Sequence, residues 1–474
     1  MLFNSLAFLL FFPIVVSLYW ALPQKFRNVF MLLSSYYFYM NWEPIYALLI
    51  LLSTATTYAS ALLIEKHAEK KRLFVTLSLL LNLGILFVYK YSGFFNTVVH
   101  DSLNALGIAI DIPNFELLLP VGISFYTFQA IGYTIDVYRG TVKAERNFIV
   151  YALFVSFFPQ LVAGPIERAK NLLPQFHERH HISGAKFIEG LQMMMWGYFM
   201  KICIADNVAT YVDAVFNNLP QHNGTSIALA ALFFTFQIFC DFGGYSLIAI
   251  GSAHCIGITL MQNFKRPYLA CSIRDFWRRW HISLTTWFTD YVYIPLGGNR
   301  CSRLKHKRNL IATFFISGIW HGANYTFVVW GLYHGILQVV QAAYRDVKSR
   351  FWIFERIGRM RILKIASVFA TFALVVLGWI IFRANSVSDA ALAIDKILFD
   401  HGMLYNGAGK PSILMPILLI GVLMSKEMLD EYRERKGAAT NKPLWRSIAS
   451  TSLLFIVILL CGCFTGGQFI YFQF

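Results

Sequence analysis

Apolar runs of about 15 to 24 residues, separated by charged stretches, recur along the whole chain, beginning with "MLFNSLAFLLFFPIVVSLYW". Because a bilayer core of about 30 Å needs roughly 20 apolar residues per helix, a chain of this kind is expected to form a bundle of transmembrane helices. Charged residues make up only 14% of the chain, against about 25% in soluble domains. The sequence therefore predicts an all-α, polytopic integral membrane protein.

The predicted crossings follow these runs, with the first one interpreted as a retained helix because no basic segment precedes it. They lie at 2–20, 27–41, 45–64, 73–91, 115–135, 147–164, 187–205, 227–250, 365–383 and 447–465. The net charge of +16 would fit a nucleic-acid partner, but the lysines and arginines fall between the apolar runs, as in membrane proteins. We therefore expect membrane lipids and no nucleic acid as partners.

The distribution of lysine and arginine predicts the orientation of the chain. Four stretches are rich in these residues: 65–72, 297–308, 345–364 and 426–446. Two others, 92–114 and 206–226, contain none, and 384–412 has only two. The positive-inside rule places the first four in the cytoplasm and the last three outside. One further crossing then leaves the C-terminal residues 466–474 on the extracytoplasmic side.

A histidine interrupts the apolar, tryptophan-rich segment 309–344, which this orientation makes a hairpin entered from the cytoplasm. Its first arm, 309–320, spans about 18 Å as a helix, less than the bilayer core, so the turn is expected at depth. An ionisable residue at that depth is a functional candidate, and His321 has a pKa range suited to a general base. Asn324 offers amide donors for an oxyanion. The alternative is a histidine that only hydrogen-bonds between helices.

Residues 274–300 combine cationic and aromatic side chains. The candidate donor-binding residues are Arg274, Trp277, Arg278, Arg279 and Trp280, together with Trp320 of the hairpin. One interpretation is an interfacial helix that extends its arginines to lipid phosphates. The other is a cytoplasmic wall that attracts an anionic donor such as coenzyme A. His281 is a second candidate catalytic group in this segment.

Two further patterns are weaker. "HERHH" (177–181) matches the zinc-protease pattern H-E-x-x-H, but it lies between a proline and a glycine in a short basic segment, where a long helix is not expected. The seven scattered cysteines form no CxxC pair. We predict no metal site. Glu167 and Arg168, in "GPIER", are expected to form ion pairs or helix caps at a membrane boundary.

These motifs together resemble the membrane-bound O-acyltransferase family, in particular its bacterial alginate O-acetylase and peptidoglycan O-acetyltransferase branch. The resemblance rests on "FWRRWHISLTTWFTDYVYIPLGGNR" and "GIWHGANYTFVVWGLYHG", supported by "LVAGPIER", "DFGGYSLIAIG" and "NFKRPY". It implies a single domain over residues 1–474, a bundle of roughly a dozen helices around a funnel or tunnel, with re-entrant and amphipathic cytoplasmic helices. His321 corresponds to the family's invariant histidine, and His281 to a second family histidine.

The same resemblance implies the reaction and its partners. The acyl group, usually acetyl, moves from a thioester donor, acetyl-CoA or an acyl carrier, to a hydroxyl outside the bacterial inner membrane; no cofactor is bound. Relatives that D-alanylate teichoic acid use a C-terminal F-x-Y-x-x-F motif, which "FIYFQF" fits with Tyr471 as its tyrosine. By resemblance, Tyr471 accepts the acyl group and passes it to an extracytoplasmic SGNH-type transferase.

Two rival functions remain open from the sequence. The first is a transporter or flippase that moves an acyl donor or a lipid-linked sugar without chemistry. The second is an acyltransferase whose acceptor is a lipid or a protein. The transporter predicts that replacing Tyr471 by phenylalanine has little effect, whereas the relay predicts loss of product.

Overall fold

The computed structural model describes residues 1–108, 118–162, 164–348, 361–407, 409–437 and 444–464. Within these ranges every regular element is a helix, which confirms the predicted all-α class. Five helical stretches there are long and apolar enough to cross a membrane: Pro44–Lys66, Ala68–Lys90, Gly224–Cys255, Ile362–Arg383 and Pro411–Arg435. The contacts divide the chain into two compact units, and the predicted single domain over 1–474 stays a prediction.

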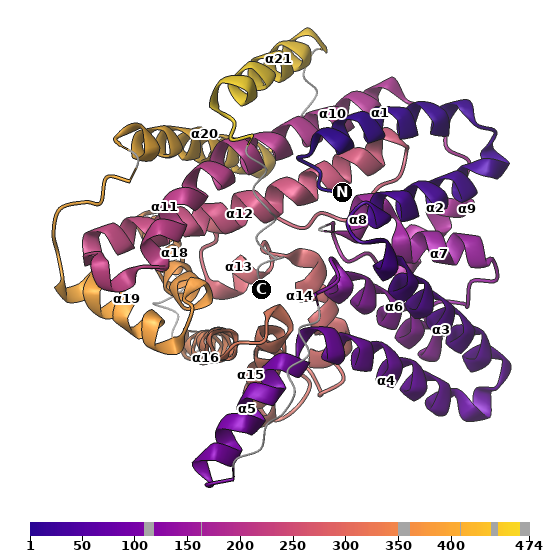
Figure 1. The fold of residues 1–474 in the computed structure, drawn as a ribbon, viewed down its shortest axis with the longest axis horizontal. Coiled ribbons are helices and arrows are strands. Elements are labelled where there is room, and N and C mark those ends of the chain that lie inside the picture. The colour runs from indigo at the N-terminus through magenta and orange to yellow at the C-terminus, as the bar shows by residue number, and fades with distance from the viewer. Residues whose placement is uncertain (109–117, 163, 349–360, 408, 438–443, 465–474) are drawn as a thin grey trace. The chain divides into compact units, whose positions relative to one another are not determined.

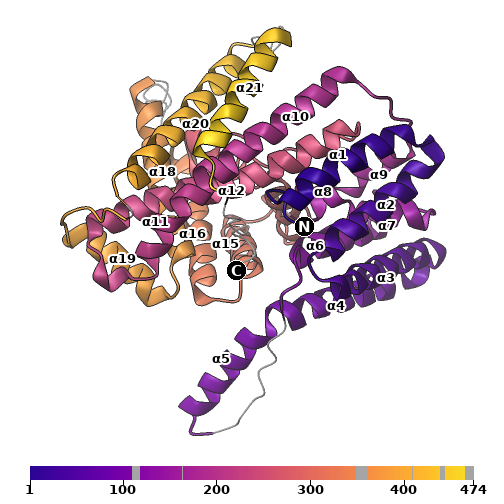
Figure 2. The same cartoon turned by 45° about the horizontal axis from the view of Figure 1, so that its top comes forward.

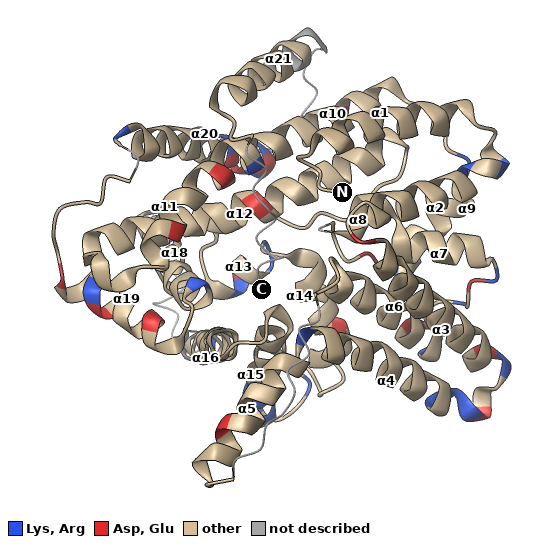
Figure 3. Ribbon diagram, viewed as in Figure 1, with Lys and Arg blue, Asp and Glu red and all other residues tan. Residues whose placement is uncertain are grey.

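The first unit comprises Met1–Met194 and Ile248–Met261. Its helices are α1 (Leu6–Ala21), α2 (Gln24–Met40), α3 (Ala47–Lys66), α4 (Lys71–Lys90), α5 (Ser92–Ala105), α6 (Ile123–Tyr138), α7 (Phe148–Ser156), α8 (Phe158–Leu161) and α9 (Ala169–His177). Helices α3, α4 and α6 pack against one another (Figure 2). Lysines and arginines gather where α3 passes into α4, at the basic stretch 65–72 (Figure 3).

The second unit comprises Met195–Leu247 and Gln262–Phe474. Its helices are the π-helix η3 (Phe199–Ala205), α11 (Asp206–Phe216), α13 (Ile273–Trp277), α14 (Ile282–Phe288), the π-helix η6 (Thr289–Tyr293), α15 (Arg303–His321), α16 (Tyr325–Lys348), α18 (Arg361–Arg383), α19 (Val387–Phe399), α20 (Pro411–Arg435) and α21 (Leu444–Cys461). All predicted catalytic and donor-binding residues that the structure describes belong to this unit.

Two helices, α10 (Gly184–Tyr198) and α12 (Gly224–Cys255), run through both units and touch at glycines. In the first unit, a Cβ added to Gly190 would lie 2.6 Å from the carbonyl oxygen of Gly251. In the second, a Cβ added to Gly244 would lie 2.7 Å from the carbonyl oxygen of Gly197. Neither space admits a side chain, so glycine is what lets these two backbones meet, as is common between membrane helices.

Most predicted crossings coincide with helices, and the exceptions have local causes. In the described part of the predicted crossing 115–135, which begins at Leu118, the helix starts at Ile123, because Gly122 before it has a positive φ of 74°. The predicted crossing 147–164 is broken into α7 and α8 at Phe157. The stretches 92–114, 206–226 and 384–412, singled out by charge alone, contain α5, α11 and α19. Helix α20 was not among the predicted crossings, because its last turns belong to the charged stretch 426–446.

The predicted hairpin is formed by α15 and α16, which lie side by side (Figure 1). Helix α15 begins at Arg303 rather than at 309, since Ser302 accepts a hydrogen bond from the Lys305 amide and the basic residues continue the helix. The two arms meet at Gly318 and Gly331, where a Cβ on Gly318 would lie 3.1 Å from the Cα of Gly331. The depth of the turn in a membrane stays a prediction.

Candidate active site

His321 is the last residue of α15 and is buried among aromatic rings. Its ring centroid lies 5.0 Å from that of Trp320, 4.9 Å from that of Trp330 and 5.4 Å from that of Phe382. Gly322 ends the helix, and a Cβ there would overlap the Phe327 ring. The hairpin turn therefore encloses the imidazole in an aromatic environment instead of presenting it at a surface.

His281 lies between α13 and α14, buried, with a positive φ of 41°. Its Nδ1 is 3.0 Å from Oδ1 of Asn263, which also accepts the Ser283 hydroxyl hydrogen at 2.9 Å. Because the Ser283 backbone N–H points at the same oxygen, that atom is the acceptor, and Nδ1 of His281 must carry the hydrogen. Nε2 then holds the lone pair. Burial lowers the pKa of His281 to about 3, which keeps the ring neutral.

The two predicted histidines share one neighbour, Trp320. The ring centroid of Trp320 lies 6.2 Å from that of His281 and 5.0 Å from that of His321. Segments that are 40 positions apart in the sequence thus place two imidazoles around one indole. A neutral imidazole with one nitrogen fixed as a donor presents a lone pair on the other nitrogen, which can accept a hydrogen bond from a reacting group.

A third buried histidine, His334 of α16, was missed in the sequence. The indole N–H of Trp277 donates to its Nδ1 at 3.4 Å, and its ring centroid lies 4.9 Å from that of Trp330. Trp330 therefore stands between His334 and His321. The sequence could have indicated His334, because it is an ionisable residue in the same apolar hairpin as His321, and such residues are functional candidates.

The predicted donor-binding segment is divided by the turn at His281 into the short helices α13 and α14. Its tryptophans are packed inside: Trp280 contacts Trp379 at 4.9 Å between ring centroids, and Trp277 contacts Trp330 at 5.7 Å. Trp320 is also buried. These indoles shape the surroundings of the histidines and are not exposed along an interfacial face.

The three predicted arginines have different environments. Arg279 is ion-paired, with Nε 3.1 Å from Asp275 and Nη1 3.1 Å from Glu431. Arg274 and Arg278 are exposed. Partial burial and the neighbouring charges of Arg345 and Arg278 lower the pKa of Arg274. Arg274, Arg278 and Arg345 therefore form a cluster of like charges, which a bound anion would stabilise.

Asn324 caps the start of α16. Its Oδ1 accepts from the Thr326 amide at 3.0 Å, and its Nδ2 donates to the carbonyl oxygen of Asn385 at 3.0 Å. An oxyanion role therefore depends on the other amide hydrogen. Tyr471 lies outside the described residues; the chain leading toward it is anchored where the Cys463 amide donates to the Ile202 carbonyl oxygen at 2.8 Å.

The H-E-x-x-H segment does not form a zinc-protease helix. Helix α9 ends at His177, whose Nε2 lies 2.8 Å from Oε2 of Glu145, and His180 contacts the Gln175 carbonyl oxygen at 2.6 Å. No group of three or more His, Cys, Asp or Glu residues in the described part of the chain is arranged to hold a metal ion.

Comparison with known proteins defines the class. Residues 143–378, which include all three buried histidines, match the model of the membrane-bound O-acyltransferase family. The chain belongs to this family and is a multi-pass membrane acyltransferase.

The relatives are named for alginate, peptidoglycan and teichoic acid. The chain is 39% identical to the probable alginate O-acetylase of Azotobacter vinelandii over 415 residues, covering 85% of this chain and 79% of the relative. It is 35% identical to the peptidoglycan O-acetyltransferase of Helicobacter pylori, covering 85% and 81%. It is 27% identical to the teichoic acid D-alanyltransferase of Bacillus subtilis, covering 58% and 71%.

Proposed function

We propose that this acyltransferase takes an acetyl group from a cytoplasmic thioester, acetyl-CoA or an acyl carrier, and passes it across the bacterial inner membrane for O-acetylation of an extracytoplasmic polysaccharide. The observation that carries the proposal is the pair of buried histidines around Trp320, one of them with a fixed tautomer. The names of the relatives support a polysaccharide acceptor, either alginate-like or peptidoglycan.

In the first step, His321 acts as the general base and removes the hydroxyl proton of Tyr471. A phenol with a pKa near 10 is a weak nucleophile at neutral pH, so a base within reach is needed. The phenolate oxygen attacks the thioester carbonyl carbon, and the oxyanion is stabilised by a donor such as the Asn324 amide. The C–S bond then breaks, and the thiolate takes the proton from the imidazolium. The products are acetylated Tyr471 and the free thiol.

His281 is the second catalytic group of the proposal, with Nε2 as its acceptor atom. The donor is attracted by the exposed Arg274 and Arg278, whose charges match the phosphates of coenzyme A or of a carrier's prosthetic group. Trp277, Trp280 and Trp320 exclude water from the reacting carbonyl, which strengthens every electrostatic interaction there.

The second transfer takes place outside. The C-terminus is extracytoplasmic in the proposed topology, so acetylated Tyr471 meets an SGNH-type transferase there. A serine oxygen of that partner attacks the aryl ester, the phenol leaves with a proton, and the partner passes the acetyl group to a sugar hydroxyl. No cofactor is bound in either step.

The test is to trap the intermediate. Membrane vesicles containing the full chain are incubated with isotope-labelled acetyl-CoA, and the C-terminal peptide is analysed by mass spectrometry for a labelled acetyl group on Tyr471. The label is expected in the wild type and absent in His321→Ala and Tyr471→Phe. A transporter without chemistry gives no labelled peptide, and neither does direct transfer to a lipid or a protein. Absence of the label in the wild type therefore overturns the relay.

A further inference from the structure

His281 is held by two short segments with unusual backbone geometry. Residues 263–266 and 279–282 are joined by backbone hydrogen bonds of 2.9 Å from Lys265 to Arg279 and from Ile282 to Asn263. Each segment contains one non-glycine residue with positive φ, 48° at Arg266 and 41° at His281, the only two among the described residues. Such a conformation is strained for a residue with a side chain and persists only where the surroundings impose it.

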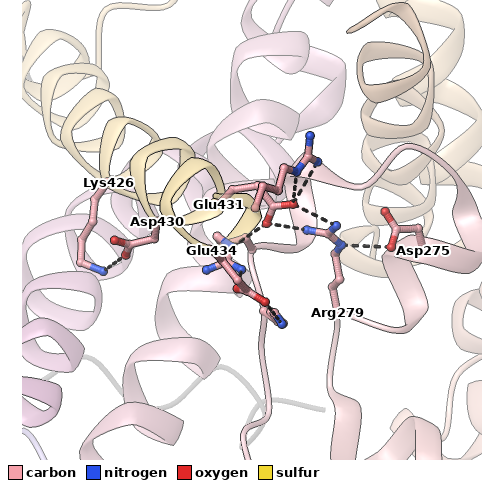
Figure 4. Close-up of polar contacts among 9 residues, drawn as sticks. Asp275, Arg279, Lys426, Asp430, Glu431 and Glu434 are labelled. Atoms are coloured by element: carbon pink, nitrogen blue, oxygen red, sulfur yellow. Dashed lines mark hydrogen bonds and ion pairs between the residues drawn. The ribbon is translucent and has the colours of Figure 1, made fainter. Parts of the chain in front are cut away.

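The surroundings include one carboxylate from a distant part of the chain, Glu431 in the last turns of α20 (Figure 4). Its Oε2 accepts from Nε of Arg266 at 2.7 Å and from Nη1 of Arg279 at 3.1 Å. Its Oε1 accepts from Arg435 at 3.0 Å. The side chains of Glu431, Arg266 and Arg279 are only 13%, 14% and 16% exposed, so these ion pairs are little weakened by water.

Neighbouring carboxylates contact only one of the two segments each. Glu434 contacts Lys265 and Arg266 and is 51% exposed. Asp275 contacts Arg279 at 3.1 Å. Among these three carboxylates, Glu431 alone joins the segment that carries Asn263 to the segment that carries His281. Without its charge, Arg266 and Arg279 would share no carboxylate among these three.

We propose that Glu431 is a positioning residue, whose carboxylate holds these two segments together so that His281 stays buried with its Nδ1 hydrogen on Asn263. The effect on acyl transfer rests on the proposed function, whereas the effect on His281 itself does not. A competing use of the same residues is anion binding, since Lys265, Arg266, Arg279, Glu431, Glu434 and Arg435 line a cavity of about 210 Å³.

The first experiment measures the chemical accessibility of the His281 ring and does not depend on enzyme activity. The purified full chain is treated with diethyl pyrocarbonate, which modifies accessible neutral imidazoles, and labelling is quantified residue by residue by mass spectrometry. Glu431→Gln is expected to increase labelling of His281 severalfold over the wild type, because the turn opens. Glu431→Asp is expected to restore part of the protection. Glu434→Gln is the matched control and is expected to leave labelling unchanged. Equal protection in Glu431→Gln and the wild type overturns the proposal.

The second measurement separates positioning from donor binding. With acetyl-CoA as donor, Glu431→Gln is expected to lower kcat roughly 10- to 100-fold through misplacement of His281, with KM for the donor within about twofold. Glu434→Gln is expected to keep kcat within about twofold. A change in KM alone assigns the cavity to donor phosphates and overturns the proposal. Increased labelling with unchanged kcat supports the positioning role and removes His281 from the proposed mechanism.

Discussion

The Nδ1 atom of His281 donates its hydrogen to Oδ1 of Asn263 over 3.0 Å, so the tautomer of a buried imidazole is set by an amide 18 positions away in the sequence. The same amide is held in place by Ser283 on one side and by Ser246, which accepts from Nδ2 at 3.0 Å, on the other. The orientation of the ring therefore depends on Asn263 and Ser246, which lie outside the sequence motif containing His281, as well as on Ser283 within it.

Replacing Asn263 by alanine tests this relationship. The Nδ1 hydrogen loses its buried acceptor, which costs about 1–3 kcal/mol and, if that cost falls on the reaction barrier, slows acyl transfer roughly 5- to 150-fold. The rate is measured as thiol released from acetyl-CoA. Ser246→Ala is the comparison, because it removes one support of the amide but keeps the Oδ1 acceptor of His281, and it is expected to slow the reaction less than Asn263→Ala. An unchanged rate in Asn263→Ala would show that the tautomer of His281 does not affect acyl transfer.

The contact between Gly318 and Gly331 predicts a steric effect. Alanine at position 318 would place its Cβ in overlap with the Phe327 carbonyl oxygen of α16 and 3.1 Å from the Gly331 Cα, so the hairpin arms must separate, at a cost of roughly 1–3 kcal/mol. Thermal unfolding in detergent is expected to show a lower Tm. Gly421→Ala in α20 is the matched control, since its Cβ would meet nothing within 4 Å. Equal Tm values for the two variants would contradict close packing of the hairpin.

His334 predicts a coupling with Trp277. In His334→Phe the buried indole N–H loses its acceptor, which is expected to destabilise the protein by about 1–3 kcal/mol. Trp277→Phe removes the donor instead. Because both variants break the same hydrogen bond, the double variant should be more stable than the sum of the two losses indicates. Urea unfolding of the four proteins measures this difference, and strict additivity would mean that the hydrogen bond contributes nothing.

Glu167 predicts a pH dependence of stability. Burial raises the pKa of this carboxyl from 4.5 to about 7, so the folded state binds the proton more tightly than the unfolded state. The stabilisation that this proton binding adds to the free energy of unfolding is complete below pH 4.5. It is lost as the pH rises through about 7, and it amounts to at most roughly 3 kcal/mol. The Tm of the wild type is therefore expected to fall over this range.

Glu167→Gln provides the comparison for this titration. The amide oxygen can still accept from the Met261 backbone N–H, as the carboxylate does, but it carries no titrating proton. The difference in Tm between the variant and the wild type should therefore grow in favour of the variant from pH 5 to pH 8. Parallel Tm curves over this range would exclude Glu167 as the titrating group.

Sequence reasoning located His321 and His281 because each stands in a tryptophan-rich segment where an ionisable residue is costly. It did not find Glu431, since nothing near position 431 indicates that its partners are Arg266 and Arg279, more than 150 positions earlier. Donor binding by Arg279 stays a prediction, but no sequence pattern indicated that two carboxylates, Asp275 and Glu431, contact this side chain. Composition predicts which segments are helical and apolar, but not which charges meet across the fold.

The same limit explains the helices that were predicted imperfectly. The residues just before Ile123 are apolar, but Gly122 adopts a left-handed backbone conformation and α6 begins only after it. The last ten residues of helix α20, 426–435, include seven charged ones, so an apolar window stops before its polar end. Side-chain chemistry sets the apolar core of each helix, whereas backbone conformation and tertiary contacts set where it starts and stops.

The left-handed backbone of His281 has a practical consequence for enzymology. Glycine adopts a φ of about 41° with little cost, so His281→Gly deletes the imidazole while relieving backbone strain, which alanine would not do. The resulting hole has the shape of the missing ring and retains the Asn263 oxygen at its inner end. Position 281 is therefore a natural place to ask whether free imidazole, added to the medium, can stand in for a catalytic side chain.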